Sequence, residues 1–366
     1  MPSKLLYVPL APADPQSKPA PLTKLQDPNK STATKGSRLE FLDFLRFIAA
    51  FSVLIQHGCE KLFPGFVDFC TNYFQFGVFG VTLFFLTSGF VIPVSLEKSN
   101  SLTRFWKGRL FRLYPLYLVS MFSTIILIAT GVFGRTMPSL VDILANLTML
   151  QKFLGRPSVL HLYWTLCLEM AFYIMISVIF RLGWLKKTTQ LTILSLMITV
   201  LIGIVGTQLF HLFSNGWGTA YYFSTMFLGF LFFRFYKGQI RRSVFVSVFL
   251  SAIVILVLTT YFNLYHKDQP QFLGTLSFLP VTLAILAAFA VFTIAFALRG
   301  REFPAIFLTM GTISYSLYLV QGTVFGIVPA LQNPYLSLVV WLSTITAISL
   351  LTYRLIEKPF ISLGKR

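Results

Sequence analysis

Long apolar segments constrain this sequence more than any other feature. A helix needs about 20 apolar residues to cross the hydrocarbon core of a bilayer. About ten segments approach that length, at residues 41–62, 73–95, 113–133, 160–181, 188–211, 219–236, 243–263, 273–298, 304–329 and 335–356. Transmembrane barrels instead use strands of about ten residues with alternating polarity. The pattern therefore predicts an all-α fold, a polytopic membrane helix bundle with about ten transmembrane helices.

The basic residues are distributed unevenly between alternate loops. Only 11% of the residues are charged, against about 25% in soluble domains, yet the net charge is +18. Five of the 30 basic residues fall in one set of loops: Lys61, Arg135, Lys152, Arg156 and Lys267. The positive-inside rule assigns the other, basic side to the cytoplasm and predicts that both termini lie there. The charge thus reflects topology. We expect membrane lipids as partners and no nucleic-acid partner.

The N-terminal 37 residues differ in composition from the rest of the chain. Residues 1–37 are rich in proline, lysine, serine and threonine, a composition that does not bury enough apolar surface to fold. We therefore predict a disordered cytoplasmic tail at 1–37 and a membrane domain at 38–366. In the longest outer loop, "PSLVDILANLTML" favours a short interfacial or re-entrant helix. Cys59 and Cys70 both fall near the outer side, where they either form one disulfide or remain free thiols.

Ionisable residues inside the apolar segments form two predicted layers, which is notable because such groups are costly in hydrocarbon. The inner layer contains Arg46, Arg109 and Arg112, with Asp43 and Glu357 as candidate partners. A guanidinium group matches the oxygens of a phosphate with two parallel hydrogen bonds. The inner layer is therefore typical of a phosphate-binding site.

The outer layer contains His57, Glu169 and Gln321, with Trp164 at a similar depth. An imidazole that titrates near neutral pH is suited to proton transfer. Arg46 and His57 are eleven residues apart, which places both on one stripe of one helix, about 16 Å apart along its axis. A phosphorylated donor anchored at the inner layer could therefore extend toward His57.

Each of these residues also has a structural interpretation. Arg109 and Arg112 lie where the positive-inside rule places arginines in any case, and Arg46 could extend to the lipid headgroups. His57 could form a hydrogen bond to a neighbouring helix. Glu169 could be held by a structural partner such as a tyrosine, because an unpaired buried carboxylate is costly.

Six motifs occur in an order that resembles the acyltransferase-3 family of integral membrane O-acyltransferases. They are "RLEFLDFLRFIAAFSVLIQHG", "FFLTSGFVIP", "FWKGRLFRLYP", "HLYWTLCLEMAFY", "GTISYSLYLVQG" and "YRLIEKPF". The family's arginine-ten-histidine motif corresponds to Arg46 and His57, and its serine-glycine-phenylalanine turn begins at Ser88. One departure is Gln321, where histidine is often found at the end of the "SYSLYL" element.

The resemblance implies transfer of an acyl group, commonly acetyl from acetyl-CoA, to a hydroxyl of a carbohydrate or glycolipid acceptor such as a cell-surface polysaccharide. It implies a multi-pass protein of the bacterial inner membrane and a reaction without metal. The expected catalytic residues are His57, Glu169 and Asp43. The expected donor-binding residues are Arg46, Arg109, Arg112, Ser88 and Glu357. The expected acceptor-binding residues are Trp164, Tyr315 and Gln321.

Two other functions are compatible with polar residues inside the membrane. A transporter or flippase for a lipid-linked sugar would line its substrate path with them, and "FFLTSGFV" would then be a flexible gate. A scaffold without activity would use them for contacts between helices. Within the acyltransferase hypothesis, His57 acts either as a general base or as a transiently acylated nucleophile.

Overall fold

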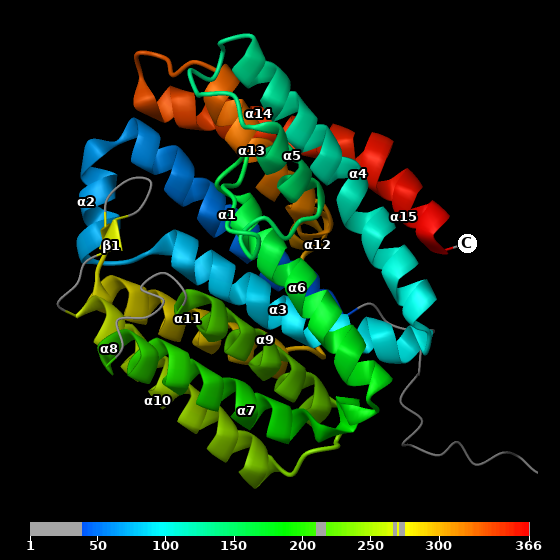
Figure 1. The fold of residues 1–366 in the computed structure, drawn as a ribbon. Helices are drawn as coiled ribbons and strands as arrows, with labels where there is room; N and C mark the ends of the chain where they lie inside the picture. The colour runs from blue at the N-terminus through cyan, green and yellow to red at the C-terminus, as the bar shows by residue number, and fades with distance from the viewer. Residues whose placement is uncertain (1–38, 210–216, 266–268, 271–274, 366) are drawn as a thin grey trace, which may run out of the picture. The chain divides into compact units, whose positions relative to one another are not determined.

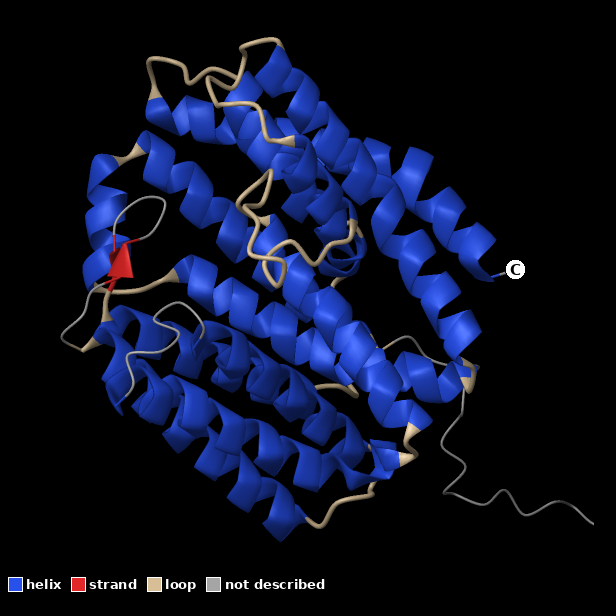
Figure 2. Ribbon diagram, in the orientation of Figure 1, coloured by secondary structure: helices blue, strands red, loops and turns tan. Residues whose placement is uncertain are grey.

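The chain is almost entirely helical in a computed structural model that describes residues 39–209, 217–265, 269–270 and 275–365. The predicted tail at 1–37 and the predicted outer-loop residue Lys267 lie outside these described residues. A two-residue antiparallel pair, β1 (Gln269–Pro270) with β2 (Thr275–Leu276), is the β-structure within them. Figure 2 shows how little of the chain this pair represents. The predicted all-α class is confirmed.

Eight helices within the described part of the chain are long and apolar enough to cross a membrane. Six of them are single helices: α1 (Glu40–Leu62), α3 (Phe76–Ser99), α4 (Leu102–Ala129), α6 (Tyr163–Arg181), α10 (Arg242–Leu264) and α11 (Phe278–Ala297). The other two are composite, η1 (Trp184–Lys187) with α7 (Thr188–Val200), η2 (Leu201–Gly206) and α8 (Thr207–Leu209), and α14 (Pro334–Thr352) with η3 (Tyr353–Glu357) and α15 (Lys358–Lys365). The predicted multi-pass architecture is therefore confirmed.

The remaining helices include the two other predicted segments. They are α2 (Pro64–Asn72), α5 (Leu140–Leu147), α9 (Trp217–Tyr236), α12 (Ala305–Thr312) and α13 (Ser314–Ile327). The predicted segment 219–236 coincides with α9, whereas 304–329 is divided between α12 and α13. The orientation in the membrane stays a prediction.

Helix α3 lies at the centre of the described bundle and packs against α1, α9 and α11. On one side of the α1–α3 pair, α7, α9, α10 and α11 pack together, and on the other side α4 packs against α13 and α15 (Figure 1). A Cβ atom at Gly89 would lie 1.8 Å from the carbonyl oxygen of Met226, and one at Gly229 would lie 2.1 Å from that of Leu86. Glycines at these two positions therefore let α3 and α9 approach at backbone distance.

The expected turn at Ser88 is wrong, because residues 88–90 lie inside α3. The helix is regular at this position, and Gly89 serves close packing against α9 instead of a change of chain direction. Phe90 is fully buried against the rings of Phe41, Phe233 and Phe296. The motif therefore combines two packing residues with one polar side chain, that of Ser88.

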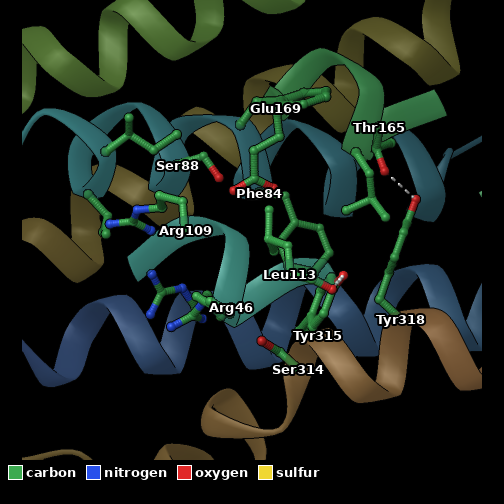
Figure 3. A pocket seen from close by; sticks show the side chains of 15 residues that line it. Arg46, Phe84, Ser88, Arg109, Leu113, Thr165, Glu169, Ser314, Tyr315 and Tyr318 are labelled. Carbon is green, nitrogen blue, oxygen red and sulfur yellow. Dashed lines mark hydrogen bonds between the residues drawn. The ribbon is translucent and has the colours of Figure 1, made fainter. Parts of the chain in front are cut away.

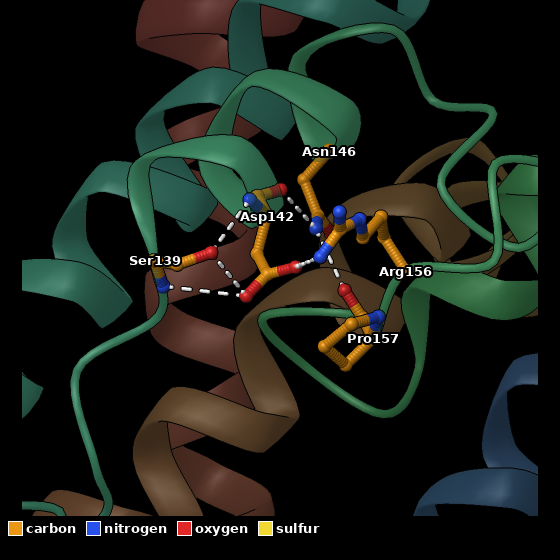
Figure 4. A network of polar contacts seen from close by, with 5 residues as sticks. All are labelled: Ser139, Asp142, Asn146, Arg156 and Pro157. Carbon is orange, nitrogen blue, oxygen red and sulfur yellow. Dashed lines mark hydrogen bonds and ion pairs between the residues drawn. The ribbon is translucent and has the colours of Figure 1, made fainter.

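The predicted short helix in the long outer loop is present as α5 (Figure 4). Ser139 and Asp142 form a capping box at its first turn, which satisfies backbone donors at the helix N-terminus. Asn146 then donates from Nδ2 to the carbonyl oxygen of Pro157 at 2.9 Å and accepts from the backbone N–H of Val159 at 3.1 Å. Arg156 lies 3.7 Å from Asp142. These contacts hold the part of the loop that leads from α5 into α6.

All three cysteines are free and buried: Cys59, Cys70 and Cys167. Of the two alternatives for Cys59 and Cys70, the structure therefore shows free thiols and no disulfide between them. Burial, with the nearby Glu60 carboxylate, raises the pKa of the Cys70 thiol in α2 to about 12, so this thiol stays protonated at neutral pH.

Candidate active site

A cavity lies between α1, α3, α4, α6 and α13, and we call it the arginine cavity. The polar residues around it include Arg46, Ser88, Arg109, Arg112, Glu169 and Tyr315. Figure 3 shows the guanidinium groups of Arg46 and Arg109 at one end of the cavity and Tyr318 with Thr165 at the other. The structure thus brings together the three arginines that the sequence placed in the inner layer.

Neighbouring side chains orient the arginines. Arg46 donates from Nη1 to Oδ1 of Asp43 at 3.1 Å, one turn earlier on α1. The guanidinium of Arg109 lies 5.6 Å from the ring centroids of both Phe105 and Tyr173, a cation–π arrangement that leaves its N–H groups available. Arg46 also interacts electrostatically with Arg109 and Arg112. The three arginines outnumber the one carboxylate among the described residues that line the cavity, that of Glu169, and this excess of positive charge favours an anionic ligand there.

Glu169 lines the arginine cavity and not the cavity that contains His57. The predicted grouping of Glu169 with His57 is therefore wrong. Sequence position gives depth along a helix, but the rotation of α6 decides which cavity a side chain faces. Tyr173, one turn further along α6, donates its hydroxyl to Oε1 of Glu169 at 2.5 Å. The tyrosine partner expected for a structural role is therefore present, while Glu169 still borders the cavity.

Arg234 provides a comparison within the same protein. Its side chain is 3% exposed and forms an ion pair with Glu97. It also donates to Oγ1 of Thr188 at 3.0 Å, to the carbonyl oxygen of Leu185 at 2.8 Å and to Gln239 at 2.7 Å. Arg234 thus acts as a structural arginine whose donors are used within the protein. The arginines of the cavity differ because they line open space.

A second cavity is lined by His57, and we call it the histidine cavity. Its polar residues are His57, Lys61, Arg135, His161 and Gln321. His57 and Gln321 are therefore close together, as the outer layer predicted. Because α1 carries Arg46 at one cavity and His57 at the other, a single helix connects the two sites.

A buried polar network holds a carboxylate beside His57. Oε2 of Glu60 lies 3.9 Å from Nδ1 of His57. Gln56 donates from Nε2 to Glu60 at 2.6 Å and to Gln75 at 3.2 Å, and it accepts a hydrogen bond from the backbone of Gly77. A carboxylate facing Nδ1 favours a proton on that nitrogen and leaves Nε2 as the basic atom. Glu60 is thus placed to orient His57.

Tyr318 connects the walls of the two cavities. Its ring lines the arginine cavity, and its hydroxyl lies 2.8 Å from Oγ1 of Thr165 and 3.1 Å from the carbonyl oxygen of Leu162. Leu162 lines the histidine cavity. Nε2 of Gln321 donates to the backbone carbonyl of Tyr318 at 3.0 Å. A ligand that reached from one cavity to the other would pass this tyrosine.

Several predicted site residues line the other cavity or line neither cavity. Tyr315 belongs to the arginine cavity, where it donates to the carbonyl oxygen of Leu113 at 2.8 Å. Trp164 packs against Phe85 and Tyr222 and lines neither cavity. Asp43 contacts the site through Arg46. Glu357 is 2% exposed and accepts a hydrogen bond from Ser316. It does not line the cavity, but it interacts electrostatically with Arg112, which does.

The residues that the sequence analysis missed are mainly on the side of His57. They are Glu60, Lys61, Arg135, His161 and Tyr318. Glu60 follows His57 by three residues, the spacing of neighbours on one helix face, so this pair was detectable. Arg135 and His161 come from loops, where no periodicity indicates position. Among the described residues, no three His, Cys, Asp or Glu side chains form a group that could hold a metal ion.

The fold and these cavities define a class of protein: a multi-pass membrane helix bundle with an arginine-lined cavity and a histidine-lined cavity on one helix. The model of the acyltransferase domain of the acyltransferase-3 family matches residues 39–354, and the chain belongs to that family. The match covers both cavities.

Curated relatives carry consistent names. The chain is 26% identical over 372 residues to "Putative peptidoglycan O-acetyltransferase YrhL" of Bacillus subtilis (strain 168), covering 89% of this chain and 55% of that protein. It is 30% identical over 158 residues to "Acyltransferase MdmB" of Streptomyces mycarofaciens, covering 40% of each. The chain thus spans about half or less of the length of these relatives. No solved structure matches it significantly.

Proposed function

We propose that this protein transfers an acyl group, acetyl in the first instance, from acyl-CoA to a hydroxyl of a carbohydrate acceptor. The family and the name of the Bacillus relative support acyl transfer to a carbohydrate. We further propose that it works in the bacterial inner membrane, with the arginine cavity facing the cytoplasm, in agreement with the distribution of basic residues.

One observation carries the proposal: α1 presents Arg46 to one cavity and His57 to another, about 16 Å apart. The phosphates of coenzyme A would bind Arg46, Arg109 and Arg112, whose planar forks match phosphate oxygens. Ser88 would donate a further hydrogen bond. The extended pantetheine arm would pass Tyr318 and bring the thioester toward His57, and the acceptor would enter the histidine cavity from the opposite direction.

In the chemical step, Nε2 of His57 would take the proton of the acceptor hydroxyl, while Glu60 stabilises the imidazolium that forms. The hydroxyl oxygen would attack the thioester carbonyl, the carbon–sulfur bond would break, and the thiolate would take the proton back from His57. Asp43 would hold Arg46 in place. Glu169 would act through its hydrogen bond with Tyr173 to fix the wall of the arginine cavity. A role for Glu169 in direct proton transfer to the acceptor is weaker, because it lines the other cavity.

The test is an assay of labelled acetyl-CoA with the purified protein in detergent or in membranes that carry cell-wall glycans. We expect label to enter the glycan fraction with release of free coenzyme A in equal amount. Mass spectrometry of glycans from cells with and without the gene then identifies the acyl group from its mass. Movement of a glycan across the membrane of vesicles without any dependence on acyl-CoA would contradict the proposal and favour a transporter.

A further inference from the structure

The histidine cavity contains positive charge where the topology predicts little. Lys61 and Arg135 are two of the five basic residues predicted on the outer side, and both line this cavity. Two of the four histidines of the chain, His57 and His161, line it as well. The positive-inside rule accounts for arginines at the cytoplasmic cavity, but it does not account for cations concentrated at the opposite side.

The described residues that line this cavity include no carboxylate to balance these charges. Nζ of Lys61 lies 3.4 Å from the carbonyl oxygen of Phe325 and 5.8 Å from the centroid of its ring. Glu60 is 8% exposed, receives a hydrogen bond from Gln56 and faces His57. The cationic side chains at the cavity therefore lack a matching acidic wall, which leaves an attractive field for an anion.

One residue that lines the same cavity has a buried acceptor atom. The side chain of Gln321 is fully buried, and its Nε2 donates to the carbonyl oxygen of Tyr318. Its Oε1 is buried and accepts no hydrogen bond from the described residues. An unsatisfied buried acceptor costs free energy that a ligand donor would recover. A hydroxyl group beside His57 would provide that donor.

We propose that the acceptor is an anionic carbohydrate, with one hydroxyl at Gln321 and His57 and a carboxylate or phosphate at Lys61 and Arg135. This proposal rests on the proposed function and adds the chemical class of the acceptor. A neutral sugar would satisfy Gln321 but would leave Lys61 and Arg135 unpaired. A planar guanidinium and an ammonium bind carboxylate and phosphate alike, so the shared property is negative charge.

The test measures binding of three saccharides that share one sugar ring to the purified protein. They are N-acetylglucosamine (neutral), N-acetylmuramic acid (carboxylate) and N-acetylglucosamine 1-phosphate (phosphate). We expect at least one anionic saccharide to bind about tenfold more tightly than the neutral one. Comparison of the carboxylate with the phosphate identifies which anion the site prefers.

Variants assign that preference to the two cations. The double variant Lys61→Met with Arg135→Gln should lose most of the preference and leave binding of the neutral saccharide unchanged. Lys152→Met is the matched control, because Lys152 is another outer-side cation that lines neither cavity, and it should retain the preference. Equal binding of all three saccharides, no binding of any, or a preference that survives in the double variant would overturn the proposal.

Transfer from labelled acetyl-CoA, measured in parallel, separates this proposal from the proposed function. A charge preference without transfer to any saccharide contradicts the acyltransferase mechanism and leaves the anion site intact. Transfer without a charge preference contradicts the anion site and leaves the mechanism intact.

Discussion

Helix α1 borders both cavities of this protein, and the residues that line the two cavities carry different kinds of charge. The arginine cavity contains guanidinium groups that keep their charge at all physiological pH values, whereas the histidine cavity combines imidazoles with one lysine and one arginine. A permanent charge is suited to holding a phosphate, and an imidazole is suited to moving a proton. The proposed function therefore separates binding of the donor from chemistry on the acceptor along α1.

Replacing His57 with glutamine is the substitution expected to have the largest effect. Glutamine keeps polarity but does not titrate, so loss of the general base should lower turnover by about 10²–10⁴-fold. Binding of coenzyme A at the arginine cavity should remain unchanged. The measurements are single-turnover transfer from labelled acetyl-CoA and, separately, equilibrium binding of coenzyme A, because KM alone does not separate the two steps.

This variant tests the separation of the cavities directly. Its matched control is His161→Gln, which replaces the other imidazole of the same cavity and should keep most of the turnover. If His57→Gln abolishes binding of coenzyme A, the two cavities do not divide donor binding from chemistry, and the proposed arrangement is wrong.

Replacing Arg46 with lysine should produce the converse result, with a smaller effect. Lysine keeps the charge but loses the planar fork and its contact with Asp43, so we expect affinity for coenzyme A to fall about tenfold. Turnover at saturating donor should be reduced only in part. Arg104→Lys is the control, since Arg104 is an exposed arginine of α4 that does not line the cavity. Unchanged donor affinity in Arg46→Lys would argue that the cavity does not bind the donor phosphates.

The sequence predicted the arginine cavity better than the histidine cavity. Arg46, Arg109 and Arg112 are at helix positions in recognisable motifs, and rotation by about 100° per residue relates neighbours on one helix. Depth along the predicted spans also placed His57 with Gln321, which lies on another helix. It failed for Glu169, because depth along α6 is readable from sequence whereas the direction that its side chain faces depends on how α6 packs in the bundle.

The remaining part of the site depends on the loops. Arg135 and His161 are on either side of α5 in the chain, and they reach the cavity through the folded path of the loop that Asn146 and Asp142 stabilise. No periodicity encodes such a path. The helical class, by contrast, follows directly from apolar segments that hydrocarbon forces to satisfy their backbone hydrogen bonds internally.

Replacing Glu60 with glutamine tests whether the carboxylate beside His57 contributes to chemistry. Glutamine keeps the shape but removes the charge that would stabilise an imidazolium, so we expect kcat to fall roughly tenfold, a smaller loss than removal of the base itself. KM for the donor should be unchanged, because Glu60 does not line the arginine cavity. Steady-state kinetics checks both values. Gln56→Ala, which removes the hydrogen bond to Glu60, should lower kcat less, and a rise of donor KM in Glu60→Gln would indicate a structural role instead.

The smallest expected effect concerns His161 and sharpens the electrostatic contrast between the cavities. Loss of surrounding water, together with the neighbours His57 and Arg135, lowers the pKa of His161, which precedes α6, below its ordinary value of 6.5. The unfolded chain therefore takes up this proton at a higher pH than the folded protein does. Stability is unaffected above the unfolded pKa and is lost as pH falls below about 6.5 toward the folded pKa.

Relative to the wild type, His161→Gln should therefore gain no more than about 2 °C in Tm at pH 5.5 and nothing at pH 8, as thermal unfolding in detergent would show. With Arg135→Gln as background, the positive charge of Arg135 is absent and the gain should be smaller. An equal gain at both pH values would show that His161 acts through packing and not through its charge.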